Sequence, residues 1–193
     1  MKSPHSILLA SGSPRRRELL TQLVANFDVA AADIDESLIG GETPRDYVLR
    51  LSRAKALAGY GQSGGRLPVL GSDTIVLLDG EILGKPESRA AAERMLSRLS
   101  GRTHEVYSGV ALALDAETVL EAINISAVTF GEMPLAWIRK YCQGDEPMDK
   151  AGAYAVQGGT AQYICRIEGS YSGVMGLPLF ETAQLLRHAG LLE

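Results

Sequence analysis

The sequence predicts an α/β protein: a mixed β-sheet flanked by helices, in two lobes around a central cleft. The 193 residues suffice for one domain, residues 1–193, with a sizeable core. Strand-length apolar runs and helix signals are mixed along the chain, without the strict alternation of a purely parallel fold. Two long apolar stretches flank Asp115-Ala116-Glu117 and predict a hairpin. We expect the lobe boundary between the first half and this hairpin, where a groove would be a natural ligand site.

The first half of the chain supplies three expected strands and two expected helices. The first helix runs from Pro14 to about Val24 and the second from Pro44 to about Ala58. Each follows a hydroxyl residue that suits an N-cap and begins with a proline. The glycines of Gly59–Gly65 predict a loop after the second helix. The expected strands are Ile7–Ala10, Phe27–Ala31 and Pro68–Leu78.

The second half begins with a hairpin signal at Asp79-Gly80 and has a helix stop at Ser100-Gly101. The glycines of Gly169–Leu177 predict another loop. The other expected elements are a strand at Glu81–Leu83, a helix at Glu87–Leu99, strands at His104–Leu114 and Thr118–Phe130, a helix at Pro134–Tyr141, a polar segment at Gly144–Gly159, a strand at Gln162–Ile167 and a helix at Pro178–His188.

Composition argues against several classes of protein. The formal net charge is −4, so there is no basic excess with which to bind nucleic acid. No stretch approaches the length of a membrane span, and the apolar run Ile7–Ala10 is too short for a signal sequence. Cys142 and Cys165 are too few for a disulfide framework and lack metal-ligand spacing. We expect a cytoplasmic protein with no nucleic-acid or membrane partner.

The turn after the first strand carries the strongest functional signal. Ser13 is a suitable N-cap, but Arg15, Arg16 and Arg17 crowd a helix N-terminus, whose dipole prefers negative charge. A bound anion would resolve this conflict. Backbone N–H groups, the hydroxyls of Ser11 and Ser13, and the guanidinium groups would together cradle a phosphate chain. The alternative is that the arginines are merely solvated.

One carboxylate interrupts an otherwise apolar strand. Asp73 lies within Val69–Leu78, a pattern typical of a strand buried on both faces. An unpaired buried carboxylate is costly, so Asp73 needs a metal, a cation or hydrogen-bond donors. It is a candidate metal ligand, general base or both. The alternative is a structural aspartate that accepts bonds from neighbouring backbone N–H groups.

Two lysines are candidates for binding phosphate. Lys85 is not part of a Walker-type loop, because its spacing from Gly80 is one residue short and Pro86 replaces the required hydroxyl residue. It could still reach a phosphate as a point charge, or lie on the surface. Lys55 lies at the edge of the apolar stripe of the second helix. It either extends to solvent or points into a cleft toward an anion.

Two loops could complete a site. One carboxylate of the acidic loop Asp33–Ser37 could join Asp73 in holding Mg²⁺, or the loop could simply be solvated. Gln157 lies among small residues and offers both a donor and an acceptor, which suits recognition of a base edge. It could equally be an ordinary loop residue. The three histidines show no spacing typical of a metal site or a triad.

Six short motifs follow one another along nearly the whole chain, from about Ile7 to the last helix. They are Ser11-Gly12-Ser13-Pro14-Arg15-Arg16, Lys55, Gly71-Ser72-Asp73-Thr74, Gly84-Lys85-Pro86, Asp149-Lys150-Ala151-Gly152-Ala153-Tyr154 with Gln157, and Gly176-Leu177-Pro178-Leu179. In this order they closely resemble the Maf family of nucleoside triphosphate pyrophosphatases. Any one motif would be weak evidence, but the ordered set is specific.

The resemblance implies a fold of the Maf/inosine-triphosphate-pyrophosphatase type, with two lobes around a cleft. The implied reaction is hydrolysis of a nucleoside triphosphate to the monophosphate and pyrophosphate, with a divalent cation, Mg²⁺ or Mn²⁺. Asp73 matches the position of the family's general base, and Glu36 matches an acidic position that would supply a second metal contact. The residues that would hold the triphosphate are Arg15, Arg16, Lys55 and Lys85.

Three positions track the substrate within the family. Arg15, Thr74 and Gln157 resemble the dTTP/UTP enzymes, whereas the 7-methyl-GTP branch tends to carry tryptophan, glutamine and glutamate there. The resemblance thus implies dTTP and UTP as chief substrates, removal of non-standard nucleotides as the role, and a homodimer. Two alternatives stay open: a preference for 7-methyl-GTP or another modified nucleotide, or a nucleotide-sensing regulator of cell division.

Overall fold

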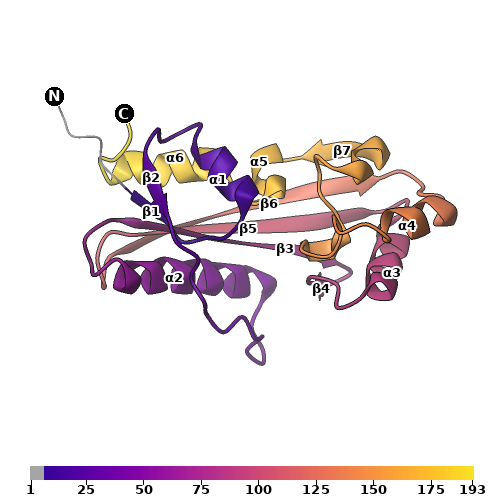
Figure 1. The fold of residues 1–193 in the computed structure, drawn as a ribbon, viewed down its shortest axis with the longest axis horizontal. Coiled ribbons are helices and arrows are strands. Elements are labelled where there is room, and N and C mark those ends of the chain that lie inside the picture. Colours follow the sequence, from indigo (N-terminus) through magenta and orange to yellow (C-terminus); the bar gives the residue numbers. More distant parts are fainter. Residues whose placement is uncertain (1–6) are drawn as a thin grey trace. The chain divides into compact units, whose positions relative to one another are not determined.

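The computed structural model describes residues 7–193 and contains a seven-stranded mixed sheet flanked by helices (Figure 1). The strands are β1 (Ile7–Leu9), β2 (Phe27–Val29), β3 (Val69–Leu78), β4 (Glu81–Leu83), β5 (Thr103–Ala113), β6 (Val119–Phe130) and β7 (Ile164–Glu168). The helices are α1 (Pro14–Leu20), α2 (Pro44–Gln62), α3 (Arg89–Leu99), α4 (Leu135–Tyr141), α5 (Tyr171–Met175) and α6 (Leu179–His188), with 3₁₀ turns at Ala151–Ala153 and Gly159–Tyr163. The mixed sheet and its flanking helices confirm the predicted fold class.

The sheet order is β2-β1-β3-β5-β6-β7, and β4 pairs with β3. β1 is parallel to β2 and β3, whereas β4 and β7 are antiparallel to β3 and β6. Leu9 of β1 lies opposite Leu70 of β3, three residues before Asp73. This register places the turn that leaves β1 beside the part of β3 that carries Asp73.

The chain forms two compact units, and β3, β5 and β6 contribute residues to both. Among the described residues, the first unit contains residues 7–73, Ser108–Asn124 and Gly176–Glu193, and the second contains Thr74–Tyr107 and Ile125–Met175. Each unit has its own apolar core. The expectations of one Maf-like domain over residues 1–193 and of a cleft between lobes stay predictions. No helix within residues 7–193 is long and apolar enough to cross a membrane.

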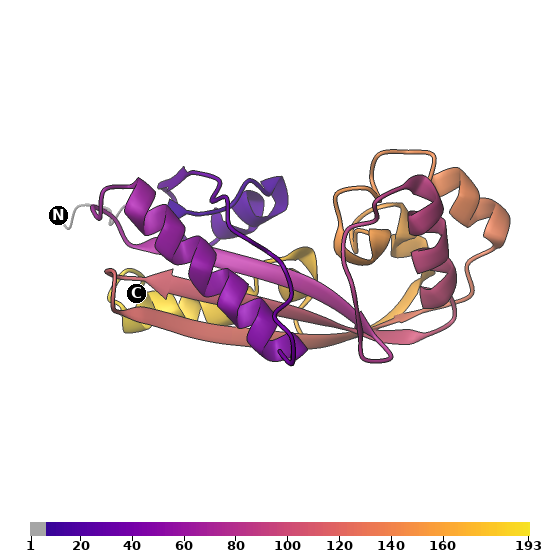
Figure 2. The same ribbon diagram turned by 90° about the horizontal axis from the view of Figure 1, so that it is seen from below.

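In the first unit, α2 runs along one face of the sheet and α6 covers the opposite face, as the two views of Figures 1 and 2 show. α2 begins as predicted, with the Thr43 side chain accepting a hydrogen bond from the Asp46 N–H. The predicted end at Ala58 is wrong, since α2 continues to Gln62. The reason is packing: a Cβ on Gly59 would lie 2.9 Å from Ala10 and Val69, so this glycine permits close approach rather than a turn.

Other boundaries also differ from the predicted ones. α1 ends at Leu20, one turn short of the predicted Val24. The predicted loop Gly169–Leu177 contains the short helix α5, and the predicted polar segment contains a 3₁₀ turn. Short helices of this size lack the length over which an apolar periodicity can be recognised. In the second unit, α3 contacts α4 and the Ala151–Ala153 turn around the core.

Candidate active site

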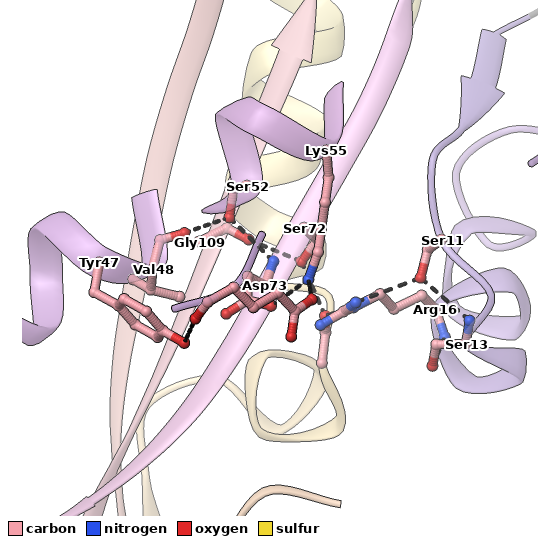
Figure 3. A network of polar contacts seen from close by, with 12 residues as sticks. Ser11, Ser13, Arg16, Tyr47, Val48, Ser52, Lys55, Ser72, Asp73 and Gly109 are labelled. Carbon is pink, nitrogen blue, oxygen red and sulfur yellow. Dashed lines mark hydrogen bonds and ion pairs between the residues drawn. The ribbon is translucent and has the colours of Figure 1, made fainter. Parts of the chain in front are cut away.

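Lys55 joins two carboxylates of the first unit, and Figure 3 shows its contact with one of them, Asp73. Its Nζ lies 2.6 Å from Asp73 Oδ1 and 2.7 Å from Glu36 Oε1. Lys55 and Asp73 are each only 8% exposed. The lysine therefore does not extend to solvent. A buried carboxylate needs a metal, a cation or hydrogen-bond donors, and the partner of Asp73 is a cation.

Ser52 fixes how α2 sits against β3. Its Oγ accepts a hydrogen bond from the Asp73 N–H at 3.0 Å and donates to the Val48 carbonyl at 2.7 Å. Lys55 follows three residues later, so both side chains lie on the same face of the helix. A Cβ on Gly109 would lie 2.6 Å from Ser52 Oγ, and one on Gly71 would overlap the Ser52 carbonyl. These glycines let the helix bring Lys55 to Asp73.

The acidic loop is held against α2 through its backbone. The Tyr47 hydroxyl donates to the Glu36 carbonyl at 2.8 Å, and Arg50 donates to the Ser37 carbonyl at 3.0 Å. Glu42 accepts two hydrogen bonds from the Arg50 guanidinium, at 2.6 and 2.8 Å. Burial, together with the negative charge of nearby carboxylates, raises the pKa of Tyr47, so its hydroxyl stays protonated and can donate. The same helix thus carries Lys55 and orients the Glu36 segment.

The turn after β1 forms as the sequence predicts. Ser13 Oγ accepts from the Arg16 N–H at 3.4 Å, and Ser11 Oγ accepts from the Ser13 N–H at 3.2 Å and from Arg16 Nη1 at 3.4 Å. Arg16 Nε donates to the Gly176 carbonyl at 2.7 Å. Burial lowers the pKa of Arg16, whereas the negative charge of Asp73 raises it. The guanidinium is therefore held between the turn and the carboxylate site.

The Gly176 carbonyl links this arginine to β3. It also accepts a hydrogen bond from Ser72 Oγ at 3.0 Å, and Ser72 contacts the Gly109 carbonyl at 2.8 Å. Sequence reasoning assigned no role to Ser72, Ser52 or Tyr47. A signal existed for Ser52, a polar residue four positions after Val48 on the buried face of α2.

A pocket of about 380 Å³ lies beside the turn. Arg17 is exposed and helps to line it, and Arg15 is half-buried. The turn therefore has open space next to its hydroxyls, as anion binding requires. The residues that line the pocket are Ser11, Gly12, Ser13, Pro14, Arg17, Glu18, Thr21 and Val29.

Three predicted site residues belong to the second unit. Thr74 is half-buried on β3, and Lys85 and Gln157 are exposed. The segment before Lys85 is fixed by a hydrogen bond from the Gly152 N–H to the Gly84 carbonyl at 3.1 Å. In the first unit, the structure brings together Ser11, Ser13, Arg16, Glu36, Lys55 and Asp73.

Asp73 and Glu36 form a donor set that fits a divalent cation bound together with a phosphate. Both carboxylates approach the single Lys55 ammonium, so their oxygens lie close together. Residues 7–193 contain no group of three or more His, Cys, Asp or Glu side chains that could hold a metal. Mg²⁺ typically takes one or two carboxylates and fills its other positions with water and substrate phosphates. Asp73 and Glu36 supply these two carboxylates.

Comparison with known proteins agrees with these motifs. The chain is 49% identical over 196 residues to a protein of Geotalea uraniireducens (strain Rf4) named dTTP/UTP pyrophosphatase, covering 100% of both chains. It is 47% identical over 188 residues to the protein of that name in Escherichia coli (strain K12), covering 97% of this chain and 95% of the other.

Its fold is similar to the solved structure of the Staphylococcus aureus Ham1 protein, with a TM-score of 0.50 at 14% identity over 96% of this chain and 99% of the other. The family model described as Maf-like protein matches residues 6–189. With its six ordered motifs, its mixed sheet and these whole-length relatives, the chain belongs to the Maf family.

Proposed function

We propose that this protein hydrolyses nucleoside triphosphates, chiefly dTTP and UTP, to the monophosphate and pyrophosphate. The observation that carries the proposal is the Lys55 ammonium joined to Asp73 and Glu36, beside the Ser11–Arg16 turn. The substrate class comes from the two relatives named dTTP/UTP pyrophosphatase, which match nearly the whole chain. The physiological role that the family resemblance implies is removal of non-standard or excess nucleotides.

Phosphate binding would use the turn after β1 and the cations next to it. The hydroxyls of Ser11 and Ser13 and the guanidinium of Arg16 are already oriented by hydrogen bonds within the turn. An arginine fork gives paired, charge-assisted hydrogen bonds to phosphate oxygens. Because these hydrogen bonds already hold the groups in place, they would be able to stabilise charge that develops on the phosphates during the reaction.

Asp73 would act as the general base. A water oxygen forms a bond to the α-phosphorus while its proton passes to the Asp73 carboxylate. The bond between the α-phosphorus and the bridging oxygen breaks, and pyrophosphate leaves with that oxygen and its electron pair. Lys55, 2.6 Å from Asp73 Oδ1, fixes the carboxylate and adds positive charge beside the reacting phosphate.

Pyrophosphatases of the Maf family are generally metal-dependent. In this chain Asp73 and Glu36 would hold the cation, and we propose Mg²⁺ or Mn²⁺. When bound, such an ion neutralises phosphate charge and polarises the phosphoryl group. Lys55 keeps the two carboxylates together before the substrate arrives.

The resemblance to the dTTP/UTP branch supports roles for four further residues. Arg15 and Lys85 would bind phosphate oxygens, and Thr74 and Gln157 would contribute to nucleotide preference. Gln157 has the donor and acceptor that a pyrimidine edge can pair with. These roles stay proposals.

We further propose a homodimer in the cytoplasm, with a nucleotide as the partner molecule and no nucleic acid. One observation supports the cytoplasmic location and another supports the absence of a nucleic-acid partner. Cys142 and Cys165 are both free thiols, as expected in a reducing compartment. The net charge of −4 gives no general attraction to a nucleic-acid backbone. The homodimer rests on the resemblance alone.

A nucleotide panel tests the proposed function. The wild-type protein with Mg²⁺ is assayed against dTTP, UTP, CTP, 7-methyl-GTP and dITP, and the products are separated. We expect rapid release of pyrophosphate and monophosphate from dTTP and UTP. Release of orthophosphate instead would contradict the reaction, and faster turnover of 7-methyl-GTP or dITP would contradict the substrate. Binding without turnover would support a nucleotide sensor.

A further inference from the structure

Gln157 lies at the tip of a tight turn in the second unit. The Ala155 carbonyl accepts hydrogen bonds from the Gly158 N–H at 3.0 Å and from Thr160 Oγ1 at 2.8 Å. Ala155 and Thr160 are buried, whereas Gln157 is exposed. The turn therefore presents one polar side chain from a fixed base.

Glu146 forms a hydrogen bond to Gly159, which lies thirteen residues later and follows this turn. Its carboxylate accepts a hydrogen bond from the Gly159 N–H, at 3.1 Å to Oε1 and 3.5 Å to Oε2. A Cβ on Gly158 would overlap Glu146 Oε1, so the carboxylate occupies the space that a side chain would fill. This contact fixes the backbone of the two residues that follow Gln157.

Glu146 is itself held in place. The Tyr141 hydroxyl donates to Glu146 Oε1 at 2.9 Å, and Lys150 Nζ donates to the Glu146 carbonyl at 2.7 Å. The Tyr141 ring stacks on Trp137 at a centroid distance of 5.0 Å and also packs on Gly159. Burial raises the pKa of Tyr141, as does its hydrogen bond to Glu146, so the proton stays on the phenol.

We propose that Glu146 is a positioning residue for nucleotide preference, because its carboxylate holds the turn that presents Gln157. The inference rests on the proposed function, since it takes Gln157 as the group that contacts the base. Glu146 touches no reacting atom in this account. Its removal should therefore alter which nucleotides are accepted more than it alters the chemical step.

The test compares kcat and KM for UTP, dTTP and CTP in the wild type, Glu146→Ala, Gln157→Ala and the double variant. Glu146→Ala should lower kcat/KM for UTP and dTTP about tenfold, mostly through KM, because a charge-assisted hydrogen bond to the turn is lost. The preference for UTP and dTTP over CTP, measured as the ratio of kcat/KM values, should become smaller in both single variants. The double variant should be no worse than Gln157→Ala, because both changes act through one group.

Two further variants separate positioning from simple stability. Glu146→Gln keeps an oxygen that can accept from Gly159 and Tyr141, so it should restore most of the preference. Asp145→Ala is the matched control: its side chain is 100% exposed, and its ion-pair partner Arg89 lies 3.7 Å away. It should behave as the wild type. If Glu146→Ala does not fold, Gly158→Ala is the second variant. Its Cβ would push the Glu146 carboxylate away while Glu146 itself is kept. It should reduce the preference for UTP and dTTP over CTP in the same way.

The outcomes distinguish this inference from the proposed function. If Gln157→Ala loses the preference but Glu146→Ala keeps it, the inference is overturned and the proposed function stands. An equal fall in kcat for all three nucleotides in Glu146→Ala would also overturn the inference. If the wild type does not turn over dTTP or UTP, the proposed function fails, and the inference with it.

Discussion

Lys55 illustrates how much one residue's role depends on its neighbours. The helical pattern placed it at the edge of an apolar stripe, which left solvent and cleft as alternatives. The structure shows it buried between Asp73 and Glu36. The need of Asp73 for a partner was predictable from the cost of burying a carboxylate. The identity of that partner was not, because 18 residues separate the two in the chain.

Removing the lysine should cost more stability than neutralising its main partner. In Lys55→Met, the buried Asp73 carboxylate loses its cation, which should lower the free energy of unfolding by about 3 kcal/mol. In Asp73→Asn, the ammonium keeps Glu36, whose side chain is 49% exposed, so the loss should be smaller. Urea denaturation of both variants measures this asymmetry. Equal losses would show that Glu36 does not compensate.

Ser52, Ser72 and Tyr47 mark the limit of residue-level prediction at the site. Their side chains bond to backbone atoms of other elements, namely Asp73 N, the Gly176 carbonyl and the Glu36 carbonyl. Such bonds form only after strands and helices have been brought together. A single sequence records the hydroxyl groups but not the backbone atoms that they meet.

At the scale of elements, α2 organises the carboxylate part of the site. It supplies Lys55 and Ser52 and holds the Glu36 loop through Tyr47. Its start was predictable because a capping hydroxyl and a proline are local signals. Its end was not, since the glycines from Gly59 to Gly65 predict a loop. Gly59 is required instead by the approach of the helix to β1 and β3.

Two glycines of α2 give opposite expectations for the same change. Gly59→Ala should destabilise the protein by about 1–3 kcal/mol, because its Cβ would lie 2.9 Å from Ala10 and Val69. At Gly61 an added Cβ would have no atom within 4 Å, so Gly61→Ala should stabilise the protein by about 0.5–1 kcal/mol through helix propensity. The melting temperatures of Gly59→Ala and Gly61→Ala, each compared with the wild type, test both expectations. Stabilisation by both substitutions would refute the packing explanation.

At the scale of the whole molecule, the mixed sheet was predictable from strand-length apolar runs, but the order of its strands was not. Parallel pairing of β1 with β3 joins segments about 60 residues apart. No local pattern encodes that choice. The division into two units was expected near the middle of the chain, whereas each unit combines separate stretches of sequence.

The core of the second unit contains a histidine that makes folding sensitive to pH. His104 is 2% exposed and packs against Phe130 and Tyr154. Its Nε2 lies 2.7 Å from the Tyr154 hydroxyl, and within residues 7–193 its buried Nδ1 has no hydrogen-bond partner. Burial lowers the pKa of His104 from 6.5 to about 4. The native state therefore holds this ring neutral.

Acidification should destabilise the protein through His104. Between pH 6.5 and about 4 the unfolded state binds a proton that the native state does not, so stability falls as the pH falls. The full loss from this group is about 3 kcal/mol. His104→Gln should flatten this part of the stability profile in urea titrations from pH 7 to 4. His188→Gln, at an exposed position, is the control and should leave the profile unchanged.

The central claim is that Lys55 and its two carboxylate partners, Asp73 and Glu36, form the catalytic centre of a pyrophosphatase. The most direct measurement is pyrophosphate release from UTP by the wild type and by Asp73→Asn, with circular dichroism to confirm that both are folded. The account predicts that the variant folds and binds UTP but that its kcat falls by at least about 10³-fold, because the proton acceptor is lost. A folded variant with near-normal kcat would contradict the account.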